Sequence, residues 1–386
     1  MRTHPARRTG LAALLGLLLS GTAVWAQPAS PAPADTASSP AAAAAAEPLP
    51  NRFAIHGYLT QGWAQSTGTA FYGMSNRPSS DFRYAAVQAR FRATEKDLFL
   101  VQLNHRRLGR SPITDFESDV NLNWAFYQRT LGTGTTVKVG RIAIPRGIYN
   151  ELRSVGVALP TYRPPVVFYD EGAYYSETID GAVVSHRFAE EAAWSLDAHL
   201  YGGGWRSLAY DTWSESYGIA RVRAENAVGA QLWLHTPAEG VRVGVAAQRY
   251  DYDWDSDVPY EVKEWHVSLD ATRERGFLRT EAQLQNYGQD KFYSGYVQLG
   301  ARVTPRLTLT GEVQRSRDTD VQYGEGLPAS FEWHRSDGLG AAFAIAPNFV
   351  LKAEHHWDRG IQVEQPADPM RAPRFRYAIL SLSASF

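Results

Sequence analysis

Few residues in this chain have the types and spacing that metal binding or acid–base chemistry requires. Glu354, His355 and His356 are consecutive, and carboxylate and imidazole groups are common metal ligands. On a β-strand, however, successive side chains point to opposite faces, so the two histidines are not expected to share an ion. A second acidic group could bind calcium or cations that bridge lipopolysaccharide, although a solvated acidic loop explains it more simply: Asp251, Asp253, Asp255 and Asp257.

The sequence motifs of common enzyme sites are absent. The chain has no Gly-x-Ser-x-Gly elbow, no His-Glu-x-x-His pair and no phosphate-binding loop. Gly132-Thr133-Gly134 reads as a turn between strands, because no helix pattern follows it. The chain has no cysteine, which excludes a cysteine nucleophile and a thiolate zinc site. We therefore predict no cofactor, no metal and no catalytic residue.

Charged and aromatic residues gather instead in one long segment, residues 143–176. It contains arginines, carboxylates, tyrosines and several prolines, among them Pro145, Pro160, Pro164 and Pro165. A loop of this length in a compact protein is usually functional.

The segments around this loop alternate with a period of two residues. Leu307, Leu309 and Val313 share one face, with polar residues between them. In residues 220–234 the even positions are mostly apolar, whereas Arg221 and Arg223 fall on the other face. Such alternation is typical of strands with one apolar and one polar face.

The connections between the expected strands alternate in length. Short turns are expected near residues 94–97, 131–135, 189–192, 236–240, 273–276, 304–305 and 346–348. Longer or more polar loops are expected near residues 66–82, 108–118, 143–176, 202–216, 254–260, 289–291, 317–332 and 362–373. Short turns on one rim and long loops on the other are typical of outer-membrane barrels. The pattern predicts an all-β fold, a transmembrane antiparallel β-barrel of about 16 strands, with long extracellular loops and short periplasmic turns; 14 or 18 strands would also fit.

The N-terminus predicts export. Arg2, Arg7 and Arg8 precede the apolar run 11–19, and Val24-Trp25-Ala26 offers small residues for a cleavage site, as in a signal peptide. We assign residues 1–26 to this signal peptide and the Ala/Pro-rich residues 27–50 to a flexible periplasmic spacer. Residues 51–386 form the expected barrel.

The C-terminal strand shows the alternation most clearly. Its apolar residues occupy every second position: Ala378, Leu380, Leu382, Ala384 and Phe386. A terminal aromatic residue on an amphipathic strand resembles the signal that the barrel-assembly machinery reads. We therefore expect insertion into the outer membrane of a Gram-negative cell, in contact with lipid and lipopolysaccharide. The 11 Trp, 20 Tyr and 16 Phe fit aromatic girdles at the membrane interfaces. With 39 basic and 40 acidic residues, the chain lacks the basic surplus of a nucleic-acid binder.

The long loop and both ends of the barrel carry a family pattern. The residues that carry it are Val139-Gly140-Arg141, Pro145, Gly147, Tyr149, Pro160, Arg163-Pro164-Pro165, Tyr169 and Asp180-Gly181, with Ile55-His56-Gly57-Tyr58-Leu59 and Phe386. In this pattern the chain resembles Gram-negative porins, particularly relatives of the phosphate-selective and dicarboxylate-type porins. The chain has only five lysines, so the phosphate-site lysines of that family have no clear counterpart and phosphate selectivity does not carry over.

In such porins the third loop folds inward and narrows the channel. The resemblance therefore implies these candidate constriction residues: Arg146, Tyr149, Glu151, Arg153, Tyr162, Arg163, Asp170 and Glu171. A solvated extracellular loop or a contact in a trimer are the alternative roles for this segment. The resemblance alone suggests a homotrimer.

Charged residues on the polar strand faces are expected to line the lumen. They are Arg90, Arg92, Arg106, Arg221, Arg223, Arg242, Glu264, Arg279, Glu281, Arg302 and Glu312. Because basic residues outnumber acidic ones on this face, we expect weak anion preference; charge pairing with little selectivity is the alternative.

The sequence thus predicts a porin whose water-filled channel passes small polar or anionic solutes by passive diffusion. No segment is expected to plug the barrel, and a barrel of this width encloses an aqueous channel. Two other classes stay open: an outer-membrane barrel enzyme of the phospholipase or protease type, and an adhesion or scaffold barrel.

Overall fold

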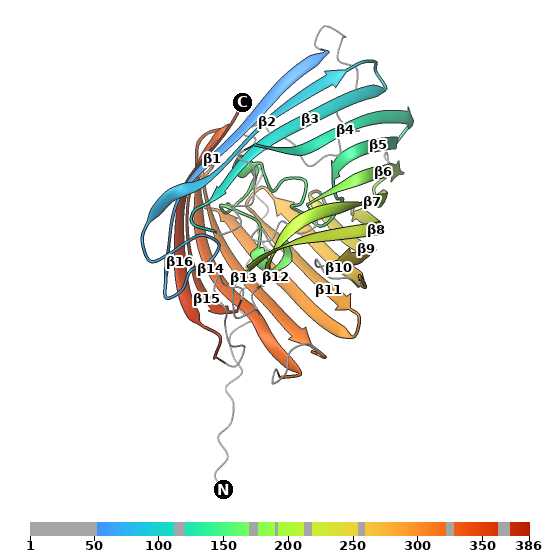
Figure 1. The fold of residues 1–386 in the computed structure, drawn as a ribbon. Coiled ribbons are helices and arrows are strands. Elements are labelled where there is room, and N and C mark those ends of the chain that lie inside the picture. Colours follow the sequence, from blue (N-terminus) through green and yellow to red (C-terminus); the bar gives the residue numbers. More distant parts are fainter. Residues whose placement is uncertain are drawn as a thin grey trace. The chain divides into compact units, whose positions relative to one another are not determined.

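The computed structural model describes residues 52–111, 120–169, 177–189, 192–211, 218–253, 259–321, 328–361 and 371–386. Within these residues, sixteen antiparallel strands close into one barrel, and each strand pairs with its neighbours in sequence (Figure 1). The strands are β1 (Phe53–Thr67), β2 (Ser79–Arg92), β3 (Asp97–Leu108), β4 (Asn121–Gly132), β5 (Thr135–Ala143), β6 (Thr178–Phe188), β7 (Ser195–Asp211), β8 (Gly218–His235), β9 (Val241–Asp253), β10 (Tyr260–Arg273), β11 (Gly276–Tyr287), β12 (Asp290–Arg302), β13 (Leu307–Thr319), β14 (Ser330–Ala346), β15 (Phe349–Gly360) and β16 (Arg374–Ser385). The predicted fold class and strand number are confirmed.

The connections divide into two rims. The short-turn rim holds residues 93–96, 133–134, 189, 192–194, 236–240, 274–275, 303–306 and 347–348, together with the start of β1 and the end of β16. The other connections start from the opposite, long-loop rim, and their described parts include 68–78, 144–169 and 371–373. One predicted loop, 202–216, is wrong in its first half, because β7 continues to Asp211. There Gly203 adopts a φ of +153° beside the backbone of Gly181, a close approach that a side chain would block.

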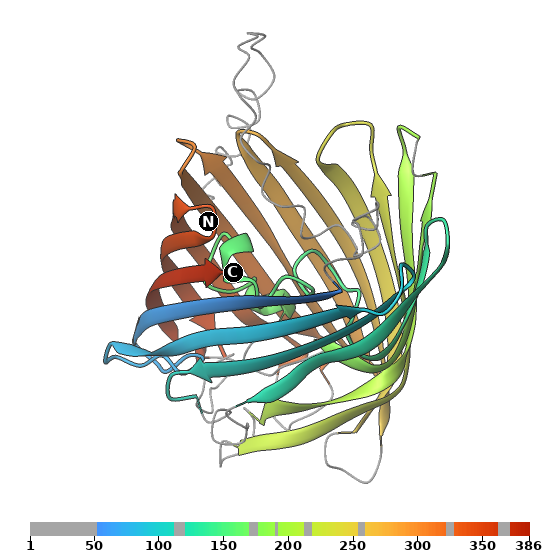
Figure 2. The same cartoon turned by 90° about the horizontal axis from the view of Figure 1, so that it is seen from above.

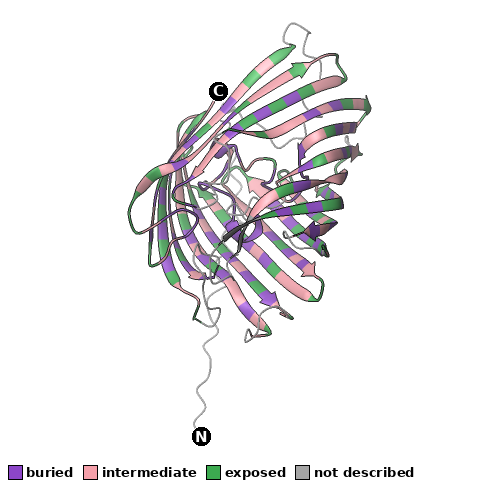
Figure 3. Ribbon diagram, viewed as in Figure 1, coloured by how far each residue is buried: buried purple, intermediate pink, exposed green. Residues whose placement is uncertain are grey.

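The two faces of the barrel have opposite polarity. Exposed apolar side chains cover the outer face on nearly every strand, for example Val87, Val101, Val245, Val297 and Leu380. Buried polar side chains cover the inner face, among them Gln102, Gln231, Gln248, Gln298 and Ser383. Figure 3 shows buried and exposed positions alternating along the strands. An apolar exterior around a polar interior suits a barrel whose outside contacts lipid.

The closing seam joins the first and last strands. Gly57 and Phe386 exchange two backbone hydrogen bonds, of 2.9 Å and 3.0 Å. The Phe386 ring lies over Gly57, where a Cβ atom would come within 2.1 Å of it, and Phe386 is 77% exposed. Ala378 and Leu380 also face outward, as the alternation predicts.

A β-bulge in β8 changes which face two predicted lumen residues occupy. The pairing of β8 with β9 shifts between Glu225 and Val228, and Asn226 has a φ of +52°. Before the bulge the odd positions face outward, so Arg221 and Arg223 are exposed on the outer face and Arg223 pairs with Asp253 at 2.6 Å. Their assignment to the lumen wall was wrong, because the extra residue reverses the parity.

Residues 144–169, the described part of the long connection after β5, lie inside the ring of strands, as Figure 2 shows. They contain the short helices η3 (Gly156–Ala158) and α1 (Val166–Tyr169). We call residues 144–169 the lumen segment. No helix among the described residues is long and apolar enough to cross a membrane. The predicted signal peptide and spacer, residues 1–50, lie outside the described residues, as do the candidate constriction residues Asp170 and Glu171.

Candidate functional site

The lumen segment is held on one side by a buried carboxylate of the barrel wall. Glu281 of β11 is 1% exposed and accepts hydrogen bonds from the Ile148 backbone N–H at 3.0 Å and from the Tyr169 hydroxyl. Ser268 and Tyr296 donate two more, at 2.7 Å and 2.6 Å. Burial, and then the Glu281 charge, raise the pKa of Tyr169 well above its usual range, so this hydroxyl stays a donor.

Two predicted constriction residues reinforce this attachment. Arg146 donates to the Gln283 side chain at 2.6 Å and to the Phe168 carbonyl at 3.1 Å. Tyr149 donates to Gln298 and accepts from Arg279 at 2.9 Å. Both residues are buried, so they anchor the segment to β11 and β12 and do not border open space.

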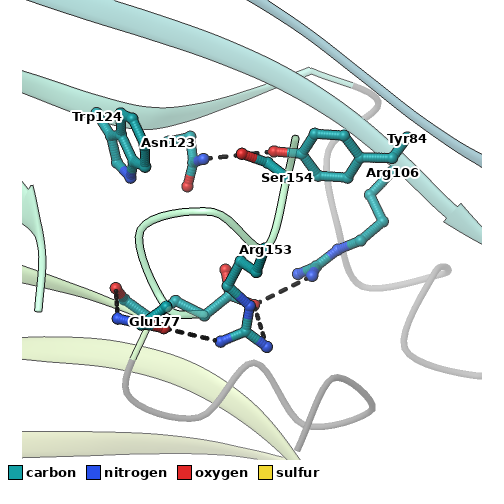
Figure 4. Close-up of a pocket in the computed structure, with 8 residues that line it drawn as sticks. Tyr84, Arg106, Asn123, Trp124, Arg153, Ser154 and Glu177 are labelled. Atoms are coloured by element: carbon teal, nitrogen blue, oxygen red, sulfur yellow. Dashed lines mark hydrogen bonds and ion pairs between the residues drawn. The ribbon is translucent and has the colours of Figure 1, made fainter. Parts of the chain in front are cut away.

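On the opposite side, an ion-pair group ties the segment to β3 (Figure 4). Arg153 lies 3.3 Å from the Glu177 carboxylate, and Arg106 lies 3.1 Å from it. Burial raises the pKa of Glu177, but the charges of Arg153 and Arg106 lower it by more. The pKa of this carboxyl therefore lies below its usual value. The cavity between these residues and Tyr84, Asn123 and Trp124 has about 10 Å³, room for roughly one water.

A third attachment reaches the closing seam. The buried Lys352 ammonium donates to the carbonyls of Gly156 and Thr161, at 2.6 Å and 2.8 Å. The Tyr162 backbone N–H donates to Glu354 at 3.3 Å. A Cβ on Gly156 would lie 2.0 Å from the hydroxyl oxygen of Thr60, so a larger residue here would displace that side chain. The lumen segment thus spans the barrel between three parts of its wall.

The connection 68–78 covers part of the same region from the long-loop rim. Phe71 and Met74 are fully buried and pack in one cluster with Tyr162 and Tyr377. The Arg163 guanidinium lies over the rings of Tyr72, Phe71 and Tyr377, at 4.9, 5.6 and 5.6 Å from their centroids. Tyr162 and Arg163 are therefore packing residues of the segment, and neither borders open space.

Glu151 differs from these buried residues. Its side chain is 48% exposed within the barrel and lies 3.9 Å from the Lys138 ammonium of β5. Arg153, by comparison, is only 7% exposed. Among the described constriction candidates, Glu151 is therefore the most exposed residue.

The lumen-wall candidates other than Arg221 and Arg223 lie on the inner face, in three different settings. Arg106, Arg242 and Arg279 each pair with a carboxylate. Glu264, Glu281 and Glu312 are buried and accept hydrogen bonds from neighbouring side chains. Arg90, Arg92 and Arg302 keep partial or full exposure near the short-turn rim.

One inner-face cluster has the residue types of a hydrolase site. Ser336 donates to Asp358 at 2.8 Å and lies 3.3 Å from the Nδ1 atom of His356. All three are buried, and the His356 ring stacks on Tyr377 with centroids 4.3 Å apart. The serine hydroxyl is thus directed at a carboxylate and enclosed, which does not suit a nucleophile. His355 lies on the outer face against Trp357, and no group of three potential metal ligands occurs among the described residues.

Sequence reasoning missed several of these contacts. Lys352 could have been found, since it is a rare lysine at a polar-face position. Phe71 and Met74 could have been suspected as apolar residues within a loop. Glu177 gave no signal, because its partners Arg106 and Arg153 are distant in sequence.

Comparisons with known proteins support the fold described above. No protein-family model and no curated protein matches the sequence. Three solved structures each align over 86% of this chain and 97% of their own. They are Salmonella typhi OmpF in complex with daunomycin (12% identity, TM-score 0.59), the outer membrane channel DcaP of Acinetobacter baumannii (10%, 0.57) and outer-membrane expressed OmpT of Vibrio cholerae (9%, 0.54). At these identities the likeness shows the fold alone, a closed sixteen-stranded antiparallel barrel.

Proposed function

We propose that this chain is an outer-membrane channel through which small polar solutes diffuse passively. The observation that carries the proposal is the lumen segment, which is fixed across the interior by buried polar contacts to three parts of the wall. A segment held in this way narrows a passage and determines which solutes fit. The apolar outer face supports placement in a membrane, and the likeness to OmpF and to the outer membrane channel DcaP supports the outer membrane.

The charges beside the remaining space favour anions. The inner-face carboxylates Glu264, Glu281 and Glu312 are buried in hydrogen bonds, whereas Arg90, Arg92 and Arg302 keep exposure. Lys138 and Arg106 add positive charge beside the segment, opposed by Glu151 and Glu177. Fixed charges along a pore set its ion preference, so we infer a weak preference for anionic solutes.

The proposal extends to export and assembly. Residues 1–26 would be removed as a signal peptide, residues 27–50 would form a periplasmic spacer, and the barrel-assembly machinery would recognise the strand ending at Phe386. A homotrimer is part of the proposal, and it is supported by a Vibrio cholerae OmpT structure described as a trimer form (9% identity, TM-score 0.52). We also propose that the chain is a relative of the phosphate-selective and dicarboxylate-type porins, and the loop pattern alone supports this.

No catalytic role is proposed. An enzyme would need an accessible nucleophile or acid–base pair, whereas the Ser336, His356 and Asp358 group is enclosed. Liposome swelling tests channel against enzyme and scaffold. Liposomes that contain the purified barrel should swell in isotonic solutions of small sugars and small carboxylates, faster for the carboxylate of equal size. Swelling no faster than in protein-free liposomes would refute the channel.

A further inference from the structure

A row of arginines crosses the outer face of the last four strands. The cross-strand pairing places Arg315 of β13 opposite Arg335 of β14, Arg335 opposite Arg359 of β15, and Arg359 opposite Arg374 of β16. Directly opposed residues on neighbouring strands have Cβ atoms about 4.5–5.5 Å apart, and like charges in such pairs are destabilising. Arg376 follows two residues after Arg374 on the same face. We call these five residues the arginine row.

The arginine row is only partly neutralised within the described part of the chain. Arg315 pairs with Asp337 at 2.7 Å, and Arg335 pairs with Glu332 at 3.2 Å. Arg359, Arg374 and Arg376 form no ion pair with any described residue. Like charges gathered in this way repel one another, so an anion bound against them would be stabilising.

The place of the arginine row indicates what kind of anion this is. It lies near the long-loop rim, beside a cleft of about 530 Å³ lined by Arg335, Trp357, Arg359, Arg374, Arg376 and Gly68, among others. Among the described lining residues, Asp358 is the one carboxylate, and it is buried against His334. Trp357 and Leu339 are exposed on the same face, on the side away from the rim, where the apolar surface begins. Charge beside apolar surface suits an amphipathic ligand.

We propose that the arginine row binds the phosphate groups of a phosphorylated glycolipid of the outer leaflet, of the lipopolysaccharide class. Guanidinium groups bind phosphate oxygens through paired hydrogen bonds, and neighbouring arginines at strand spacing can hold one phosphate from two sides. The acyl chains of the lipid then lie along Trp357 and Leu339. This inference rests on the outer-membrane location in the proposed function, but not on conduction.

The test measures, by native mass spectrometry, how tightly the purified barrel binds bisphosphorylated lipid A in neutral detergent. The unmodified barrel should bind it at least about tenfold more tightly than fully dephosphorylated lipid A. Each arginine near an anionic lipid surface strengthens binding several-fold. The triple variant Arg359→Gln/Arg374→Gln/Arg376→Gln should bind it on the order of 100-fold more weakly. The matched control is Arg206→Gln/Arg223→Gln/Arg249→Gln, which removes three exposed arginines from β7, β8 and β9 and should bind within about twofold of the parent.

Several results would overturn the proposal. Equal affinity of the parent for lipid A and its dephosphorylated form would do so without any variant. Competition by inorganic phosphate at equal concentration would show a site for free anions. Dissociation of an oligomer in the triple variant, with lipid binding unchanged, would show an interface between copies of this chain. Liposome swelling by the same preparations separates the two proposals, because lipid binding and conduction can each fail alone.

Discussion

The backbone N–H of Ile148 donates a 3.0 Å hydrogen bond to the carboxylate of Glu281, and this bond joins the lumen segment to the barrel wall. Four groups donate hydrogen bonds to this carboxylate: the Ile148 backbone N–H and the hydroxyls of Tyr169, Ser268 and Tyr296. A carboxylate is the side chain that can accept from all of them at once. Glu281 therefore fixes the attachment of the segment to this side of the wall.

Glu281→Gln should loosen the lumen segment. The amide nitrogen is itself a donor, so the donors that faced its oxygen lose their acceptor, at a cost of about 1–3 kcal/mol for each. We expect a noisier open-channel current and a lower unfolding temperature, measured in planar bilayers and by circular dichroism. Glu261→Gln, an exposed outer-face change in β10, should alter neither. Quiet, parent-like currents from Glu281→Gln would argue against this anchor.

Acidification should weaken the attachment on the opposite wall. Glu177 has a lowered pKa, so its ion pairs with Arg153 and Arg106 hold at neutral pH and are lost as the pH falls through that lowered value. We expect current noise to rise in acid, at a pH below the usual range for glutamate. Glu177→Gln should show the raised noise already at neutral pH and respond less to acid. The same acid response in both proteins would assign the effect to other groups.

Charges beside the segment should set the ion preference. Glu151→Gln removes a partly exposed negative charge and should increase anion preference, whereas Lys138→Gln should decrease it. Changes of up to about fivefold in the permeability ratio are expected, the equivalent of roughly 1 kcal/mol between nearby charges in water. Reversal potentials in a salt gradient measure this ratio. A clear cation preference of the unmodified protein would refute the expected selectivity.

The sequence alone predicts the barrel well, because period-two alternation follows directly from one face contacting lipid and the other the interior. It fails where an extra residue enters a strand. Asn226 begins such a bulge, and the parity rule then assigned Arg221 and Arg223 to the lumen. Asn tolerates a positive φ better than most residues, yet nothing in the local pattern marks the bulge.

The candidate site is predictable only in part, for a different reason. The inward course of residues 144–169 agrees with the expectation from the porin resemblance. The roles within it depend on contacts far apart in sequence, such as Lys352 with Gly156 and Glu281 with Tyr169. Tyr149 and Arg146 have the residue types of a pore lining, but burial makes them anchors.

Phe386→Ala should separate folding from cellular assembly. The seam hydrogen bonds between Gly57 and Phe386 are made by backbone atoms and do not need the aromatic ring. The variant should therefore refold in detergent, while its amount in the outer membrane falls severalfold, because the assembly machinery is expected to read that ring. Heat-modifiable migration on gels and quantitative blots of membrane fractions measure the two. Unchanged membrane levels would remove Phe386 from the assembly signal.

The most direct test of a passage narrowed by the lumen segment uses the absence of native cysteine. Glu151→Cys places a single thiol on the exposed part of the segment, and Arg249→Cys places one on the outer face as a control. Single channels are recorded in planar bilayers before and after addition of a bulky, charged methanethiosulfonate. We predict discrete conductance steps. Their size should fall after modification of Glu151→Cys and stay unchanged for Arg249→Cys. The absence of conductance steps, or steps that modification at residue 151 leaves unaltered, would contradict this account.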